Sequence, residues 1–311
     1  MVLNNRIKWI DISRGIAIIL MVAGHTSIPQ SLSKFIWSFH MPLFFIVSGM
    51  MFNATKYSSL SVFVKHKTKT LVVPYLFFST IVFCSYYGTE YWRPYEIYMG
   101  WTGYALWFIP VLFMGELVLF LFRGLNSRIH IYTLFAILAL VGWLLAFCSV
   151  KMPYKIDAVP FASIFILFGF YNKTLLLDYT PRYFKTILSF VVCLFFSQVL
   201  PKTGVGANSM GYVIPNIINA IVGSYMIFSI SKHMTYHDSP CNVVLAWCGS
   251  NSIFIMAFSQ ILGYWILTGL NCFNIPGFIA LPLRYALLFS SIWLIAGILT
   301  KYTPKLVGKW K

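Results

Sequence analysis

Apolar residues fall into ten stretches along the chain, separated by short polar connections. About 20 apolar residues in an α-helix cross the hydrocarbon core of a bilayer. The pattern therefore predicts an all-α polytopic membrane protein with ten transmembrane helices, folded as a single integral-membrane domain over residues 1–311. The predicted spans are 12–29, 36–53, 71–87, 103–122, 130–149, 158–173, 184–200, 211–231, 243–268 and 277–300.

Ionisable residues interrupt the first stretch, DISRGIAIILMVAGH, at Asp11, Arg14 and His25. At about 100° per residue, His25 lies about 20° around the helix from Arg14 and about 16 Å further along it, and Asp11 lies within about 60°. A charged residue at the centre of a membrane helix costs roughly 2.5–3.5 kcal/mol. This polar face should therefore look into a protein interior or a wet cavity, and it is the first candidate functional site.

Composition supports the membrane assignment. Hydrophobic residues make up 59% of the chain, charged residues 10%, and the mean hydropathy is +0.78. A soluble domain carries about 25% charged residues. These values exclude an ordinary soluble globular protein.

The basic residues predict the orientation, because cytoplasmic loops of membrane proteins are enriched in Lys and Arg. Ten spans place sixteen basic residues on the side of both termini and five on the other, with Arg14 and Arg284 inside spans. Both termini are therefore expected in the cytoplasm. The net charge of +16 reflects this topology, and nucleic acid is not an expected partner because the chain has no compact basic domain. The sixteen are Arg6, Lys8, Lys56, Lys65, Lys67, Lys69, Arg123, Arg128, Lys173, Arg182, Lys185, Lys232, Lys301, Lys305, Lys309 and Lys311.

Two early motifs resemble a known family. The run WIDISRGIAIILMVAGH contains Asp11, Arg14, Gly15 and His25, and SFHMPLFFIVSGMMF follows it. Weaker matches are KTLVVPY (69–75), LWFIPVLF (106–113) and GSNSIFIM (249–256). In motif order and spacing the chain resembles the integral-membrane acyltransferase-3 superfamily, and most closely its fucose 4-O-acetylase-like group. The second motif supplies Phe39, His40, Met41, Pro42, Leu43, Phe44, Phe45, Ser48 and Gly49.

The resemblance implies an acyltransferase of the bacterial cytoplasmic (inner) membrane. Members of the family move an acyl group, commonly acetyl from acetyl-CoA, onto a hydroxyl of a cell-surface or lipid-linked glycan. Acyl-CoA is then a cosubstrate, and no cofactor or metal is implied. His25 matches the expected general base, since a neutral imidazole accepts a proton near pH 7. Arg14 would assist catalysis and bind acyl-CoA, or pair with Asp11 three residues earlier.

Two departures from the family pattern concern its polar residues. Many members have an Arg-x-x-Arg pair before the third span, whereas this chain offers Lys65, His66, Lys67 and Lys69. Lysine keeps the charge but loses the bidentate geometry of guanidinium. Many members also have a histidine after the late G-x-N-S segment, where this chain has Ser259 and Gln260.

Several further residues are candidates for binding, each with a structural alternative. Lys65, Lys67 and Lys69 would bind acyl-CoA phosphates or only mark the cytoplasmic side. His40 would contact substrate or cap the second helix. Glu116 lies within the fourth span, where it needs a partner or water; it would contact substrate in a cavity shared with Arg14. Trp101 and Trp107 would stack on a sugar or belong to the interfacial aromatic belt. Asp11 would orient substrate or pin the helix start, and Arg284 would snorkel to the interface.

Two other functions are compatible with the sequence. A transporter or exporter of a lipid-linked sugar or small solute would share the span count and intramembrane charges, although the paired repeats common in transporters are not evident. A catalytically inactive envelope scaffold is the other, against which the intact Arg14 and His25 argue. The sequence contains no cluster with metal-ligand spacing. Purified protein that hydrolyses acetyl-CoA, or is labelled by it, would separate the enzyme from both alternatives.

Overall fold

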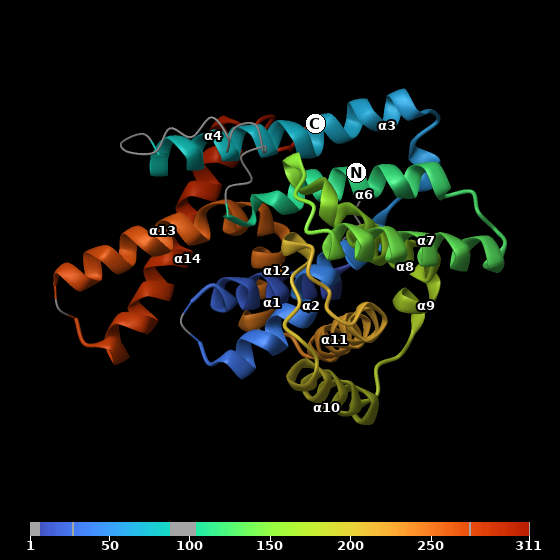
Figure 1. Ribbon diagram of the computed structural model, residues 1–311. Helices are drawn as coiled ribbons and strands as arrows, with labels where there is room; N and C mark the ends of the chain where they lie inside the picture. Colours follow the sequence, from blue (N-terminus) through green and yellow to red (C-terminus); the bar gives the residue numbers. More distant parts are fainter. Residues whose placement is uncertain (1–6, 27, 88–103, 274, 311) are drawn as a thin grey trace.

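The computed structural model describes residues 7–26, 28–87, 104–273 and 275–310 (Figure 1). Within them the regular structure is helical, apart from an isolated bridge between Gly204 and Ser209. Eight helical segments are long and apolar enough to cross a membrane, and α1 and α10 are shorter, at 17 residues each. The chain is an all-α polytopic membrane protein, as predicted. The α-helices are α1 (Lys8–Gly24), α2 (Gln30–Met51), α3 (Leu60–Lys67), α4 (Val73–Tyr87), α6 (Phe108–Phe122), α7 (Arg128–Phe147), α8 (Val159–Tyr171), α9 (Lys173–Asp178), α10 (Tyr183–Val199), α11 (Val213–Met234), α12 (Pro240–Ser250), α13 (Ser252–Cys272) and α14 (Gly277–Tyr302).

Glycines set the two closest helix crossings. Gly15 of α1 and Gly249 of α12 each lie against the other helix's backbone, at Leu245 and Asp11. Gly49 of α2 meets α8 in the same way at Ile166. A side chain at any of these positions would collide with backbone, so the crossings depend on small residues, as is common in membrane helix pairs. Gly49, a residue of the second sequence motif, thus permits close packing of α2 on α8.

The third predicted span is one long helical segment with a π-helical turn, Thr68–Val72, between α3 and α4. In this turn the Val73 amide donates to the Thr68 carbonyl. The next bond of the series would come from Pro74, which has no N–H. The Trp310 indole N–H donates to the Lys69 carbonyl instead, across 2.8 Å. The C-terminal segment thus supplies the donor that the proline lacks.

The ninth predicted span, 243–268, is not one continuous helix. It breaks at Asn251, where φ is −112° and ψ is 21°, so that α12 ends and α13 begins. The Asn251 amide side chain donates to the Trp247 carbonyl at 3.0 Å. This local bond satisfies a terminal carbonyl of α12 and competes with continuation of the helix. Hydropathy alone gave no sign of the break, because the short polar run Ser250–Ser252 lies between longer apolar stretches.

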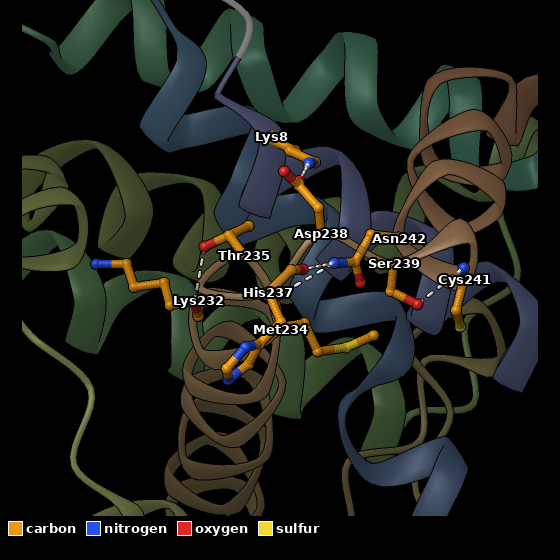
Figure 2. Close-up of polar contacts among 9 residues, drawn as sticks. All are labelled: Lys8, Lys232, Met234, Thr235, His237, Asp238, Ser239, Cys241 and Asn242. Carbon is orange, nitrogen blue, oxygen red and sulfur yellow. Dashed lines mark hydrogen bonds and ion pairs between the residues drawn. The ribbon is translucent and has the colours of Figure 1, made fainter.

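Polar contacts fasten the turn between α11 and α12 to its surroundings (Figure 2). The Asn242 side chain donates to the carbonyls of Met234 and His237 at 2.8 and 2.7 Å. Lys8, at the start of α1, donates to the Asp238 carboxylate at 2.9 Å. These contacts help hold α12 beside α1, the pairing on which the candidate site is built.

Candidate functional site

His25 lies directly after α1 and faces a cavity between this helix and the α13–α14 pair. Its backbone N–H donates to the Val22 carbonyl at 3.2 Å, which ends the helix. The cavity has a volume of about 230 Å³, below the roughly 300–1,000 Å³ of pockets that enclose a drug-sized ligand. It would therefore admit one ring or one end of a larger molecule. Its polar lining consists of His25, Thr26, Ser259, Gln260, Tyr264, Arg284 and Tyr285.

The α13 wall of this cavity carries polar groups without partners. Ser259 is 4% exposed, and its hydroxyl has no hydrogen-bond partner in the described structure. The amide nitrogen of Gln260 is likewise buried and unpaired. An unsatisfied buried polar group costs about 1–3 kcal/mol. A ligand, or ordered water, that reached these two groups would relieve this cost.

The indole of Trp37 separates His25 from His40. Its ring makes edge contacts with both imidazoles, at centroid distances of 5.3 and 5.6 Å, and its N–H donates to the Gly24 carbonyl at 3.3 Å. The Lys202 ammonium lies 4.5 Å above the same ring. The indole thus packs against the end of α1 and fixes the surroundings of His25.

His40 is buried inside α2 and cannot cap the helix, because α2 begins at Gln30. The capping alternative was wrong because the helix starts earlier than hydropathy suggested. The Nδ1 atom lies 2.8 Å from the Ile36 carbonyl, so it carries the proton and Nε2 is the acceptor. Since His40 is not part of the cavity lining, its contact with the site runs through Trp37.

Arg14 and His25 both face α13, and so share one face of α1, as the helical geometry of the first stretch predicted. The Arg14 guanidinium donates to the Ser252 hydroxyl at 3.0 Å and lies 3.8 Å from the Asp11 carboxylate, confirming the intrahelical pair. His25 shares its cavity with Ser259, two turns further along α13. The α1 and α13 helices therefore run in the same direction, and the polar face of α1 lies along α13.

Glu116 forms a buried cluster with residues of two other helices. The carboxylate, in a residue 4% exposed, lies 2.5 Å from the Lys67 ammonium and accepts a 2.6 Å hydrogen bond from the Ser48 hydroxyl. The expectation that this carboxylate needs a partner is confirmed, and Lys67 supplies the charge. Burial and the Glu116 charge raise the pKa of nearby Tyr57 to about 12, so its hydroxyl stays protonated. Neither Glu116 nor Arg14 lines the His25 cavity.

The three lysines proposed to bind acyl-CoA have different surroundings. Lys65 is exposed, Lys67 is paired with Glu116, and the Lys69 ammonium lies 5.0 Å over the Trp310 ring. Trp107 packs against the backbone of Gly206 and does not line the His25 cavity. Trp101 lies outside the described residues.

Arg284 is a cavity residue that the sequence did not place at the site. Its position eight residues into α14 suggested an interfacial side chain, and in the structure it lines the same cavity as His25. Ser259 and Gln260 were noticed only as departures from a family pattern. The sequence signal that could have identified Arg284 as a site residue is its place within an apolar span, where an arginine needs a partner.

A comparison with family models identifies the family to which this architecture belongs. A model described as an acyltransferase domain, Acyl_transf_3, matches residues 7–301, nearly the whole chain. Comparisons with curated proteins and with solved structures each found no significant match. The match includes both walls of the His25 cavity and the Arg14–Ser252 contact. The chain belongs to the acyltransferase-3 family of membrane acyltransferases.

Proposed function

We propose that this protein is an O-acyltransferase of the bacterial cytoplasmic membrane. It transfers an acyl group, acetyl, from acyl-CoA to a hydroxyl of a cell-surface or lipid-linked glycan. The observation that carries the proposal is the cavity at His25, where an imidazole shares a small polar space with Ser259 and Gln260, whose hydroxyl and amide nitrogen are unpaired. Family membership supports acyl transfer in general.

His25 acts as the general base in this proposal. A sugar hydroxyl is a weak nucleophile at neutral pH, and a neutral imidazole within hydrogen-bond reach removes its proton as attack begins. The hydroxyl oxygen bonds to the thioester carbonyl carbon, the carbon–sulfur bond breaks, and the proton passes from His25 to the departing CoA sulfur. A transient acyl-histidine would use the same residue as nucleophile, in two steps of the same overall balance.

Arg14 serves the donor at the other end of the same helix face. Its guanidinium is partly exposed, with 31% of the side chain accessible, and the Ser252 bond fixes its direction. A cation held there suits an anionic group of acyl-CoA. Lys65, which is exposed, suits a CoA phosphate better than Lys67, whose charge is used by Glu116.

The test is transfer of labelled acetyl from acetyl-CoA by the full-length protein in nanodiscs, together with mass spectrometry of surface glycans from a deletion strain. Complementation uses wild type, His25→Ala and Arg14→Ala, with His130→Ala and Arg128→Ala as controls, since both control residues are exposed on α7. We expect wild type and controls to restore glycan O-acetylation, and both site variants to fail at matched protein levels. Restoration by His25→Ala would overturn its role. Absence of acetyl transfer with wild type would favour a transporter or scaffold.

A further inference from the structure

Arg284 places a cation at the cavity without a matching anion. It is partly buried, and the described structure gives its guanidinium no hydrogen bond or ion pair. The guanidinium lies against Gly263 of α13, where an added Cβ would come within 3.2 Å of one of its nitrogens. A side chain at Gly263 would crowd this guanidinium, so the glycine leaves room for Arg284 along α13.

The remainder of the cavity is suited to an anion. None of the residues that line it is Asp or Glu. The buried Gln260 amide nitrogen and Ser259 hydroxyl are potential donors on the neighbouring wall. Arg284 is eight residues into α14, about 10 Å along the helix. A cation at such a position in a membrane segment is costly unless an anion or water meets it.

We propose that this cavity recognises an oxyanion, a carboxylate or phosphate, carried by the saccharide acceptor, and that Arg284 is the residue that binds it. This inference rests on the proposed function and specifies in addition that the acceptor is negatively charged. Guanidinium binds carboxylate and phosphate in a planar, two-point geometry. The bound anion would hold the saccharide in the cavity that His25 lines, with a hydroxyl presented to the imidazole.

A saccharide anion fits these observations better than a lipid phosphate. The cavity lies between α1, α13 and α14 and includes the buried Ser259, so an anion bound there would be enclosed by three helices. The small volume accommodates a single charged ring. A lipid phosphate remains the alternative source of the same chemistry, and the experiment separates the two.

The experiment measures how added glycosides protect His25 from carbethoxylation by diethylpyrocarbonate, read by mass spectrometry on the full-length protein in phosphatidylcholine nanodiscs. The probes are methyl β-glucuronide, methyl glucoside 6-phosphate and neutral methyl β-glucoside. Protection requires binding but no acyl transfer, so its outcome is independent of whether acetyl-CoA is the donor. Acetyl transfer measured on the same samples tests the proposed function separately.

We expect one or both anionic glycosides to protect His25 in wild type at concentrations about tenfold below the neutral glycoside, the scale of one charge-assisted hydrogen bond. Arg284→Gln should abolish this difference, Arg284→Lys should retain part of it, and Arg128→Gln on exposed α7 should leave it unchanged. Gly263→Ala, which crowds the guanidinium, should weaken it.

Equal protection by neutral and anionic glycosides in wild type would overturn the inference, as would unchanged protection in Arg284→Gln. Nanodiscs of phosphatidylglycerol provide the lipid arm. If reactivity of His25 follows the lipid and ignores the glycosides, Arg284 binds a headgroup and the inference is wrong. Retained O-acetyl transfer in that case would leave the proposed function intact.

Discussion

Arg14 donates a 3.0 Å hydrogen bond to Ser252, the first residue of α13 after the break at Asn251. The break at Asn251 and the Arg14–Ser252 hydrogen bond depend on each other. If α12 and α13 formed one continuous helix, the chain would not change direction at Asn251. Because α13 starts here, its polar residues follow the polar face of α1 from Arg14 to His25. The two ends of that face lie about 16 Å apart.

Removing the Ser252 hydroxyl should reduce acyl transfer without abolishing it. Ser252→Ala leaves the Arg14 charge and its Asp11 partner in place but removes the acceptor that directs the guanidinium. A hydrogen bond to a charged group contributes about 1.5–3 kcal/mol when buried, and less where water can replace it. We expect a loss of about threefold to tenfold in labelled acetyl transfer. Ser290→Ala, an exposed serine on α14, is the control; activity equal to this control would show that Ser252 does not position Arg14.

Neutralising Glu116 should destabilise the protein strongly. Glu116→Gln leaves the Lys67 ammonium, 15% exposed in its side chain, without its counter-ion. Breaking a buried pair from one side costs about 3–5 kcal/mol. We expect a marked fall in the thermal midpoint of purified protein, followed by tryptophan fluorescence in detergent.

The double variant Glu116→Gln with Lys67→Met provides the control for this pair. Since it removes both charges, it should be more stable than the sum of the single effects predicts. Simple additivity would mean that the two groups do not interact in the folded protein. Preserved acetyl transfer in the double variant would further show that Lys67 is not needed for acyl-CoA.

Acidification should weaken the contact between α1 and the α11–α12 turn. The hydrogen bond and charge of Lys8 lower the pKa of the exposed Asp238 below its usual value. A carboxyl with a lowered pKa in the folded state contributes stability above its unfolded pKa, and this is lost as pH falls through the folded value. Asp238→Asn should therefore lower the thermal midpoint at pH 7 and have no effect at a pH low enough to protonate Asp238. The decrease at pH 7 should be small because exposed ion pairs are weak. An equal difference in thermal midpoint between wild type and variant at pH 7 and at the low pH would contradict this.

The face of α1 was predictable from sequence because it is local. Arg14 and His25 share a helix, and helical geometry alone fixes their relative direction. The cavity was not predictable, because it needs the α13–α14 pair to pack beside α1. Nothing in the order of residues specifies that Arg284 shares a cavity with His25, and the position of Arg284 in its span pointed to the interface.

Glu116 illustrates the same limit. A carboxylate in an apolar span predicts that a partner exists, and this prediction is confirmed for Glu116. Which partner it finds depends on how α3 and α6 pack, and Lys67 carried an equally reasonable interpretation as a phosphate ligand. The break at Asn251 was missed for a different reason, since hydropathy averages do not register a side chain that bonds its own backbone.

Trp37 should affect catalysis through the position of His25 and not through substrate affinity. Trp37→Phe keeps an aromatic ring between His25 and His40 but removes the indole N–H that binds the Gly24 carbonyl at 3.3 Å. Small displacements of a catalytic group reduce the rate strongly, because transfer requires near-contact geometry. We expect kcat for acetyl transfer to fall about tenfold, with little change in KM for acetyl-CoA.

Trp143→Phe, an exposed tryptophan on α7, serves as the matched control. Trp37→Ala should reduce kcat further, because it also removes the ring contacts with both histidines. A rise in KM with unchanged kcat would place Trp37 in substrate binding instead. Equal activity of Trp37→Phe and the control would mean that the Gly24 bond does not orient His25, and that the helix end alone fixes the imidazole.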